Sequence, residues 1–410
     1  MKLIRILILS NLFSFGVYFS PNSLAKEWYF QPNASVQTIY DTNLRLLPDR
    51  NKAITNVDAF GFLSYANANF GVRSDNYDIG VNATGVINRY ISDLNLNNDN
   101  VYVTAKSIFN ITERSVFGLI GRYADDTMLN NVIDTGASAQ QNTKRTTLSI
   151  NPDWTYALSE LTSVRLDYMY ADVSYEQQVT DDFQNQRFFD NTTNSSSIEL
   201  VHQWTSAMKA HAIFNALIFD VPDLNQTTNN YNFNIGVDYN FSETWTALFE
   251  GGFYKADKEV NAAGFTSVDE STGPLFSFKT QKKFETSKID AGYYRKTATR
   301  GRGGLALVDT SYLVYTQKLS DQFEIAFRGS YNDVRSANNS TANFSSFGLS
   351  DYTFYSAGAS ASWLISPQLD LTGSYRYRFR ERQESFNNAD SNAFFLTLNY
   401  KWDTFSTRNF

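Results

Sequence analysis

Cysteine is absent from this chain of 410 residues, and histidine occurs only twice. The first absence excludes disulfide frameworks, thiolate metal sites and cysteine nucleophiles, and the second leaves very little imidazole chemistry. No run inside the chain approaches the roughly 20 apolar residues of a membrane-spanning helix. With only 7 prolines and 21 glycines, collagen-like and disordered compositions are excluded as well. The chain is instead rich in aromatic rings, with 33 Phe, 25 Tyr and 6 Trp.

The first 25 residues predict an export signal. Lys2 and Arg5 precede an apolar stretch, and Ser23-Leu24-Ala25 places small residues where a signal peptidase cuts. We therefore expect residues 1–25 to be removed and residues 26–410 to form a single exported domain. An exported chain without cysteine fits a bacterial envelope better than a small disulfide scaffold.

Beyond residue 25, apolar and polar residues alternate with period two, which is typical of strands that have one apolar and one polar face. In the segment 369–382, apolar and aromatic residues fall at odd positions, whereas Asp370, Arg376, Arg378 and Arg380 fall at even positions. Eight short turns alternate with nine longer polar loops, which predicts 18 strands. One of the predicted long loops covers residues 258–272.

An even number of strands places both chain ends at the short-turn end, as in a bacterial outer-membrane barrel with periplasmic turns and extracellular loops. The fold prediction is therefore all-β: a transmembrane, antiparallel up-and-down β-barrel with periplasmic termini. A β-sandwich or a β-solenoid would also alternate, but we see no linker between two domains and no short fixed repeat.

The tryptophans were not used to count the strands, and yet all of them lie near short turns or chain ends. They are Trp28, Trp154, Trp204, Trp245, Trp363 and Trp402. Because an indole ring prefers the membrane interface, the sequence predicts one half of an aromatic girdle at the periplasmic rim.

Two segments resemble known families. Trp28-Tyr29-Phe30-Gln31-Pro32, followed by Tyr40-Asp41-Thr42-Asn43-Leu44-Arg45-Leu46, resembles the start of β-barrel porins encoded beside exopolysaccharide and PEP-CTERM sorting systems. This resemblance implies an outer-membrane channel for polysaccharide or another envelope solute, and it transfers no site residue.

The C-terminal strand is similar to the barrel-assembly signal of outer-membrane proteins, which implies the barrel-assembly machinery as a partner. Aromatic or apolar residues alternate from Phe394 to Trp402, but eight residues follow. Either the barrel ends at Trp402 and residues 403–410 form a periplasmic tail, or the signal is degenerate.

A barrel of 18 strands is too wide for its inward side chains to fill, so we expect a water-filled lumen. Acidic residues predominate before residue 271 and basic residues after it, which predicts a basic wall that faces an acidic one and selects solutes by charge. The alternative is that these charges only keep the lumen hydrated and do not select solutes. The predicted channel-lining residues are Arg376, Arg378, Arg380, Arg382, Arg328, Lys288, Lys296, Asp238 and Asp370.

The third long loop, residues 129–145, occupies the place where general porins fold a loop into the channel. By this analogy, Asp134, Lys144 and Arg145 would form a constriction that meets the basic wall. An ordinary extracellular loop is the alternative.

Enzyme function is not predicted. His202 shares the apolar face of its strand, and His211 has no Ser or Asp at a recognisable motif spacing. We expect no cofactor and no metal, and with a net charge of −7 we expect no nucleic-acid partner.

The function predicted is passive passage of small hydrophilic or saccharide solutes, linked through the resemblance to exopolysaccharide export. The rival is a non-conducting surface barrel that binds a ligand or anchors a polysaccharide-assembly partner through its loops. Outer-membrane lipid and lipopolysaccharide are the other expected partners, and the choice between monomer and homotrimer stays open.

Overall fold

The computed structural model describes residues 26–47, 58–92, 94–128, 143–176, 188–262, 265–300, 303–337, 351–382 and 388–406. The strands are β1 Glu27–Asp41, β2 Ala59–Ser74, β3 Tyr77–Tyr90, β4 Asn98–Thr112, β5 Ser115–Thr127, β6 Lys144–Ala157, β7 Thr162–Glu176, β8 Asn191–Thr205, β9 Met208–Val221, β10 Gln226–Ser242, β11 Trp245–Ala262, β12 Phe265–Lys283, β13 Ser287–Thr299, β14 Leu305–Lys318, β15 Phe323–Ser336, β16 Tyr352–Ser366, β17 Leu369–Arg382, β18 Ala389–Lys401 and β19 Phe405–Ser406. Two short 3-10 helices, η1 Leu94–Leu96 and η2 Pro222–Leu224, lie in connections. Within these ranges, no helix has the length and the apolar composition needed to cross a membrane.

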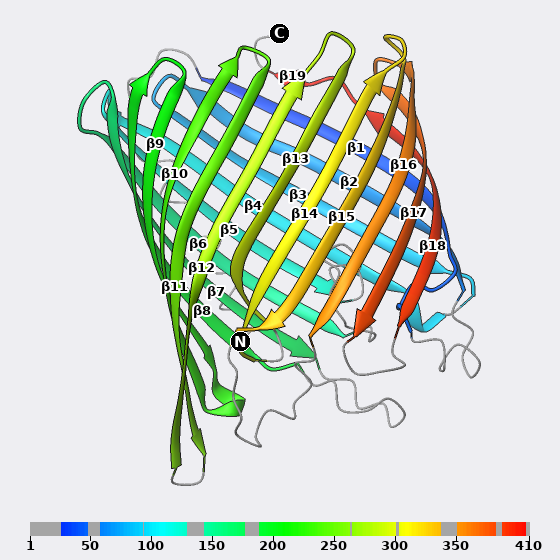
Figure 1. The fold of residues 1–410 in the computed structure, drawn as a ribbon. Helices are drawn as coiled ribbons and strands as arrows, with labels where there is room; N and C mark the ends of the chain where they lie inside the picture. Colours follow the sequence, from blue (N-terminus) through cyan, green and yellow to red (C-terminus); the bar gives the residue numbers. More distant parts are fainter. Residues whose placement is uncertain are drawn as a thin grey trace.

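The strands form one closed antiparallel barrel. Each strand from β2 to β17 pairs with its neighbours in the chain, and β18 pairs with β1 from Asn33↔Lys401 to Asp41↔Ala393. The short turns and β19 lie at the top in Figure 1, and the strand ends next to the long connections lie at the bottom. The prediction of 18 antiparallel strands with both ends at the short-turn end is confirmed.

The short strand β19 lies within residues 403–410, the segment for which the sequence predicts a possible tail. Phe405 and Ser406 pair with Phe30 and Tyr29 of β1, so the chain continues along the barrel edge after Trp402. Phe405 and Ser406 therefore lie beside β1, and residues 407–410 of the predicted periplasmic tail lie outside the described part of the chain.

The two faces of the wall differ because side chains of a strand alternate between its faces and paired residues share a face. On β8, Ile198 and Leu200 point outward and are 46% and 44% exposed. Their neighbours in the chain, Ser197 and Glu199, point inward and pair with Asn215 and Ile213 on the inner face of β9. Large apolar side chains are exposed in this way on strands all around the barrel, which gives it an apolar exterior.

The hairpin of β11 and β12 corrects the prediction of a loop at residues 258–272. Both strands continue through this segment, paired as far as Ala262↔Phe265, and the hairpin extends past the lower rim in Figure 1. β12 pairs with β13 only between Phe276↔Arg295 and Lys283↔Lys288. Pro274, two residues beyond this ladder, has no N–H to donate, which favours the separation of the two strands there.

Candidate functional site

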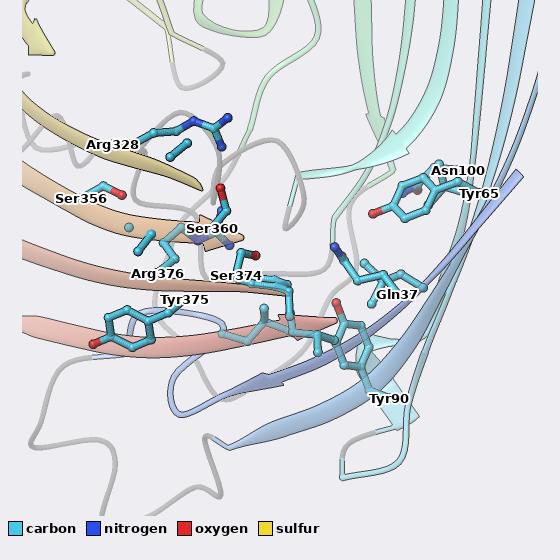
Figure 2. Close-up of a pocket in the computed structure, with 18 of the residues that line it drawn as sticks. Gln37, Tyr65, Tyr90, Asn100, Arg328, Ser356, Ser360, Ser374, Tyr375 and Arg376 are labelled. Carbon is cyan, nitrogen blue, oxygen red and sulfur yellow. The ribbon is translucent and has the colours of Figure 1, made fainter. Parts of the chain in front are cut away.

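The inner face of β15 to β18, together with that of β1 to β4, surrounds a cavity of about 530 Å³. Figure 2 shows Arg328 and Arg376 with Ser356, Ser360 and Ser374 on one side of it, and Gln37, Tyr65, Tyr90 and Asn100 on the other. Tyr102, Phe395 and Leu44 also line it. The described residues that line this cavity include two arginines and no carboxylate.

Arg376 has a defined position in the cavity wall. Its guanidinium carbon lies 5.0 Å from the centre of the Phe395 ring, a cation–π geometry. Arg328 lies on β15, across the paired strand β16, and is exposed to the interior. The structure thus brings these two predicted lining residues to the same cavity.

Arg378 and Arg380 do not line open water, which corrects part of the predicted basic wall. They face inward as the alternation predicts, but both side chains are fully buried. Arg378 Nη2 lies 2.7 Å from Asp41 Oδ2 and donates to Ser391 Oγ at 2.9 Å. Arg380 Nη2 donates to the carbonyl oxygen of Leu46 at 2.7 Å. The physical reason is that the chain after β1 folds inward and covers them.

This covering segment, residues 42–47, is called the inward turn below. Its geometry is fixed by Asn43, whose Nδ2 donates to the carbonyl oxygens of Leu47 and Asp390, at 2.9 and 3.0 Å. Asn43 Oδ1 accepts from the backbone N–H of Leu47 at 2.8 Å, and the Asn43 N–H donates to Asp41 Oδ1 at 2.9 Å. The polar groups of the turn are therefore satisfied inside the barrel.

Apolar contacts hold the inward turn against two sides of the interior. Leu44 packs in a buried cluster with residues of β1, β2 and β3, among them Ile39 and Tyr90. Leu46 packs in a second cluster with Ala306 on β14, Val334 on β15, and Tyr352 and Phe354 on β16. Residues far apart in the sequence thus meet across the long-loop end of the lumen.

The long-loop ends of β13 and β14, residues 296–300 and 303–307, also lie inside the mouth; we call them the inward tip. Thr297 Oγ1 accepts from Asn230 Nδ2 at 3.0 Å, although Asn230 is on the inner face of β10. Leu305 packs with Tyr254 and Leu275 on the inner faces of β11 and β12. The inward tip and the inward turn together narrow the mouth of the barrel.

The predicted constriction at residues 129–145 is corrected in part. Lys144 and Arg145 are strand residues of β6, and Lys144 is exposed. Arg145 forms a two-pronged ion pair with Asp126, with Nε–Oδ1 3.0 Å and Nη2–Oδ2 2.9 Å. Residues 129–142, with Asp134, lie outside the described residues.

The remaining predicted lining residues are spread over other parts of the inner wall. Lys288 Nζ lies 3.8 Å from Asp290, and Lys296 Nζ lies 5.2 Å from the centre of the Tyr294 ring. Asp370 accepts from Asn399 Nδ2 at 2.7 Å. Arg382 belongs to β17, but its side chain lies outside the described part.

Asp238 belongs to a cluster that the sequence did not reveal. Its Oδ2 lies 3.4 Å from His211 Nδ1, and Glu250 Oε2 lies 3.4 Å from His211 Nε2. The carboxylates approach opposite edges of one ring, so they do not converge on a common point. Among the described residues there is no group of three or more His, Asp or Glu side chains arranged to hold a metal ion.

The part of the lumen formed by strands before residue 271 contains basic as well as acidic side chains, whereas the sequence predicts an acidic wall there. Arg165 Nη2 lies 3.6 Å from Asp153 and 3.8 Å from Asp167 on the inner face of β6 and β7. Arg145 faces Asp126 on the same side of the barrel. These cations offset part of the negative charge on this side of the lumen.

Sequence reasoning missed the neutral half of the cavity. Gln37, Tyr65, Tyr90, Asn100 and Tyr102 all occupy inward positions of β1 to β4. The same alternation that identified the arginines could have found them. Their side chains are neutral, so a pattern of charge does not reveal them.

All six tryptophans have outward, exposed side chains near the short-turn end. Their exposed fractions range from 38% for Trp154 to 63% for Trp204. His202 lies beside Trp204 on the outer face, and its Nδ1 is 2.9 Å from Thr162 Oγ1.

No protein-family model matches the sequence, and no curated protein matches it. Solved structures with a similar fold include OccK9 (OpdG) of Pseudomonas aeruginosa, with 10% identity, 91% of this chain and 98% of that chain covered, and a TM-score of 0.48. OccAB4 of Acinetobacter baumannii has 11% identity, coverage of 94% and 100%, and a TM-score of 0.49. The outer membrane protein OpdK of Pseudomonas aeruginosa has 10% identity, coverage of 91% and 99%, and a TM-score of 0.48. At this identity the likeness concerns the fold alone.

Proposed function

We propose that this protein is an outer-membrane channel for the passive passage of small hydrophilic solutes, saccharides included. The observation that carries the proposal is a cavity with polar and basic lining inside a closed barrel whose exterior is apolar. An apolar exterior suits a lipid bilayer, and a polar interior suits water and solutes. The six outward tryptophans suit one membrane interface.

Selectivity for anions follows from the charge inside the cavity. Arg328 and Arg376 face the interior, and the described residues that line the cavity add two positive charges and no negative one, which favours anions there. Arg378 and Arg380 are not part of this basic surface, because both are buried against the inward turn.

Single-channel recording of purified, folded protein in a planar bilayer tests both statements. We expect conductance with a preference for anions. Replacing Arg328 and Arg376 together by Gln should move the reversal potential in a salt gradient towards cations. Arg89→Gln is the matched control, because it removes the same charge from a position on β3 that pairs with the outward, exposed Phe62. A folded barrel without any conductance would overturn the channel function.

A specific observation supports the rival function, a non-conducting surface barrel. The inward turn and the inward tip pack against the inner wall at the mouth, and such a barrel conducts poorly at rest. The rival predicts that conductance stays absent even after the inward turn is released. Its role would be to bind a ligand or an assembly partner through the long loops.

The finer parts of the proposal rest on the sequence. Export through a signal peptide of residues 1–25, insertion by the barrel-assembly machinery, contact with lipopolysaccharide and a link to exopolysaccharide export are all part of it. The second segment that resembles exopolysaccharide-linked porins, residues 40–46, overlaps the inward turn, and this overlap supports the proposed link to exopolysaccharide export. Cross-linking in intact outer membranes would distinguish a homotrimer from a monomer.

A further inference from the structure

We propose that a groove on the outer wall of the barrel binds one phospholipid of the periplasmic leaflet, with an acyl chain in the groove and the phosphate at Lys282. The groove crosses β10 to β13 and has a volume of about 370 Å³. The inference goes beyond the channel function, because it concerns the exterior of the barrel and requires only that this exterior faces lipid.

The floor of the groove is Gly251 on β11, where an added Cβ would meet no atom within 4 Å. Gly251 pairs with Ile235 on β10 and with Phe276 on β12, which are 55% and 38% exposed on the outer face. Large side chains thus flank a position that has none, which produces the hollow. The neighbouring outward positions towards the short turns complete the lining with Val237, Phe249, Phe278 and Tyr293.

Aromatic rings form the walls of the groove. The ring centres of Phe249 and Phe278 lie 5.0 Å apart, and those of Phe276 and Tyr293, which are stacked, lie 5.4 Å apart. In a bilayer, apolar groups associate through close van der Waals contact, because the surrounding lipid is equally apolar. A methylene chain lying over Gly251 would contact these rings on both sides.

Lys282 provides a position for the phosphate. It lies on the same face of β12 as Phe278, and it pairs with Trp245 of the aromatic girdle. Its Nζ lies 4.8 Å from the centre of the Trp245 ring, a cation–π geometry. Within the part of the chain that the structure describes, no carboxylate forms an ion pair with Lys282. An ammonium group at the membrane interface attracts an anionic lipid headgroup.

The basic residue at the other end of the groove is already paired with an acid. Arg295 lies next to Phe276, and its Nε and Nη2 donate to the two carboxylate oxygens of Asp309 at 2.7 and 2.9 Å. A lipid whose phosphate points towards the long loops would compete with this carboxylate. A lipid whose phosphate points towards the short turns meets the ammonium of Lys282 instead, which favours the periplasmic leaflet.

The spacing between Lys282 and the groove fits one lipid chain. Phe276 is six positions from Lys282 on β12, which corresponds to roughly 20 Å along the strand and about 15 Å along the membrane normal at the usual strand tilt. Since the apolar band of such a barrel is about 25 Å tall, the groove lies near the middle of the membrane. A chain that begins beside Trp245 would therefore end at Gly251.

A second copy of the barrel fits the groove less well. Two copies in one membrane, related by a twofold axis along the membrane normal, would present the same patch to each other. Both Lys282 side chains would then lie at the same height in the contact, where like charges repel.

The experiment is a lipid titration of the folded, detergent-solubilised barrel, followed by native mass spectrometry. The probes are dioleoylphosphatidylglycerol, dihexanoylphosphatidylglycerol and dioleoylphosphatidylethanolamine. We expect one molecule of the long-chain phosphatidylglycerol to bind. The short-chain lipid should bind about tenfold more weakly because its chains end before the groove, and the ethanolamine lipid severalfold more weakly because its own ammonium offsets the phosphate charge. Equal affinity for the two phosphatidylglycerols would overturn the acyl-chain site, and equal affinity for the two dioleoyl lipids would overturn the role of Lys282.

Gly251→Phe tests the groove, because the new ring fills the hollow. It should weaken the long-chain phosphatidylglycerol about tenfold and leave the short-chain lipid unchanged. Gly373→Phe is the matched control, since Gly373 pairs with the outward Leu396 and an added Cβ there also meets no atom within 4 Å. The same loss of binding in both variants would contradict the site.

Lys282→Gln tests the phosphate position and should weaken both phosphatidylglycerols severalfold. Lys283→Gln is its control, because Lys283 pairs with Lys288 on the inner face of the wall. If the two glutamine variants bind equally well, Lys282 does not hold the phosphate.

Failure of the lipid site and failure of the channel are separate results. A barrel that conducts ions but binds no phosphatidylglycerol overturns the lipid site and leaves the proposed function standing. A dimer that forms without lipid and is lost in Gly251→Phe would mean that the groove is a contact between copies, which also overturns the lipid site. Migration of each variant before and after heating on an SDS gel confirms that the barrel is folded.

Discussion

Arg376 and Arg378 stand two positions apart on the same face of β17, and yet their surroundings differ completely. Arg376 borders the cavity, while Arg378 is fully buried and paired with Asp41 and Ser391. Charge at the first position faces the cavity, and charge at the second stabilises the fold. Alternation predicts the face of a residue, but it does not predict what covers that face.

The burial of Arg378 and Arg380 could not be predicted from the sequence, because it depends on contacts with residues that are distant in the sequence. Arg378 meets Asp41 across 337 positions, and Ser391 meets Asp41 across 350. The segment 40–46 carries a family resemblance, but its sequence does not show which side chains it covers. Its Asp41 and Asn43 provide the ion pair and the turn that bury the two arginines.

At the residue scale, Arg378→Gln should destabilise the barrel strongly, because it leaves the Asp41 carboxylate buried without a cation. We expect a loss of about 3–5 kcal/mol in the free energy of unfolding. Denaturant titration of the detergent-solubilised barrel measures it. Arg165→Gln is the control, since its half-exposed ion pairs should contribute less than about 1 kcal/mol. Similar losses in both variants would contradict the structural role of Arg378.

At the scale of elements, short turns were easier to predict than long connections. A short turn appears in the sequence as a few polar residues between two segments in which apolar and polar residues alternate. The alternation is clear on both sides because each neighbouring strand has one apolar face. Beyond residue 258, the hairpin of β11 and β12 lacks a clear alternation of apolar and polar residues. Glu259, Asp269 and Glu270 place charge along its end, so the alternation fades and the segment looks like a loop.

The inward turn and the inward tip are the elements that narrow the mouth, and both depend on apolar contacts. Leu46→Asp would place a carboxylate in the cluster formed with Ala306, Val334, Tyr352 and Phe354. Because an unpaired buried charge is costly, the turn should detach from the wall. We expect a larger single-channel conductance than that of the wild type.

Leu46→Met is the control for this prediction, because it keeps an apolar side chain of similar volume. The recordings should show wild-type conductance for the methionine variant. An unchanged conductance in a folded Leu46→Asp barrel would mean that the inward turn does not limit the flow of ions.

At the scale of the whole molecule, the barrel has its apolar residues outside and its polar residues inside, the reverse of a soluble protein. Ile198 and Ser197 on β8 allow a matched test, since they are adjacent and face opposite sides. Ile198→Lys should destabilise the folded barrel in lipid vesicles by about 2–4 kcal/mol, as expected for a charge near the bilayer midplane.

Ser197→Lys is expected to fold almost as well as the wild type, because the new amine enters the lumen beside Asp167. Both variants would be titrated with urea in vesicles of the same lipid. Equal losses of stability would show that the exterior of the barrel does not face lipid.

The pairing of β1 with β18 also determines the order of assembly. β1 completes its pairing only after β18 has formed, since Asn33 to Asp41 pair with residues 393–401. Until then both strands present unpaired edges, and closing so long a loop is entropically unfavourable. The ion pair of Arg378 with Asp41 forms at the same seam. Folding kinetics should therefore show the burial of this pair as the latest step, after the hairpins along the chain have formed.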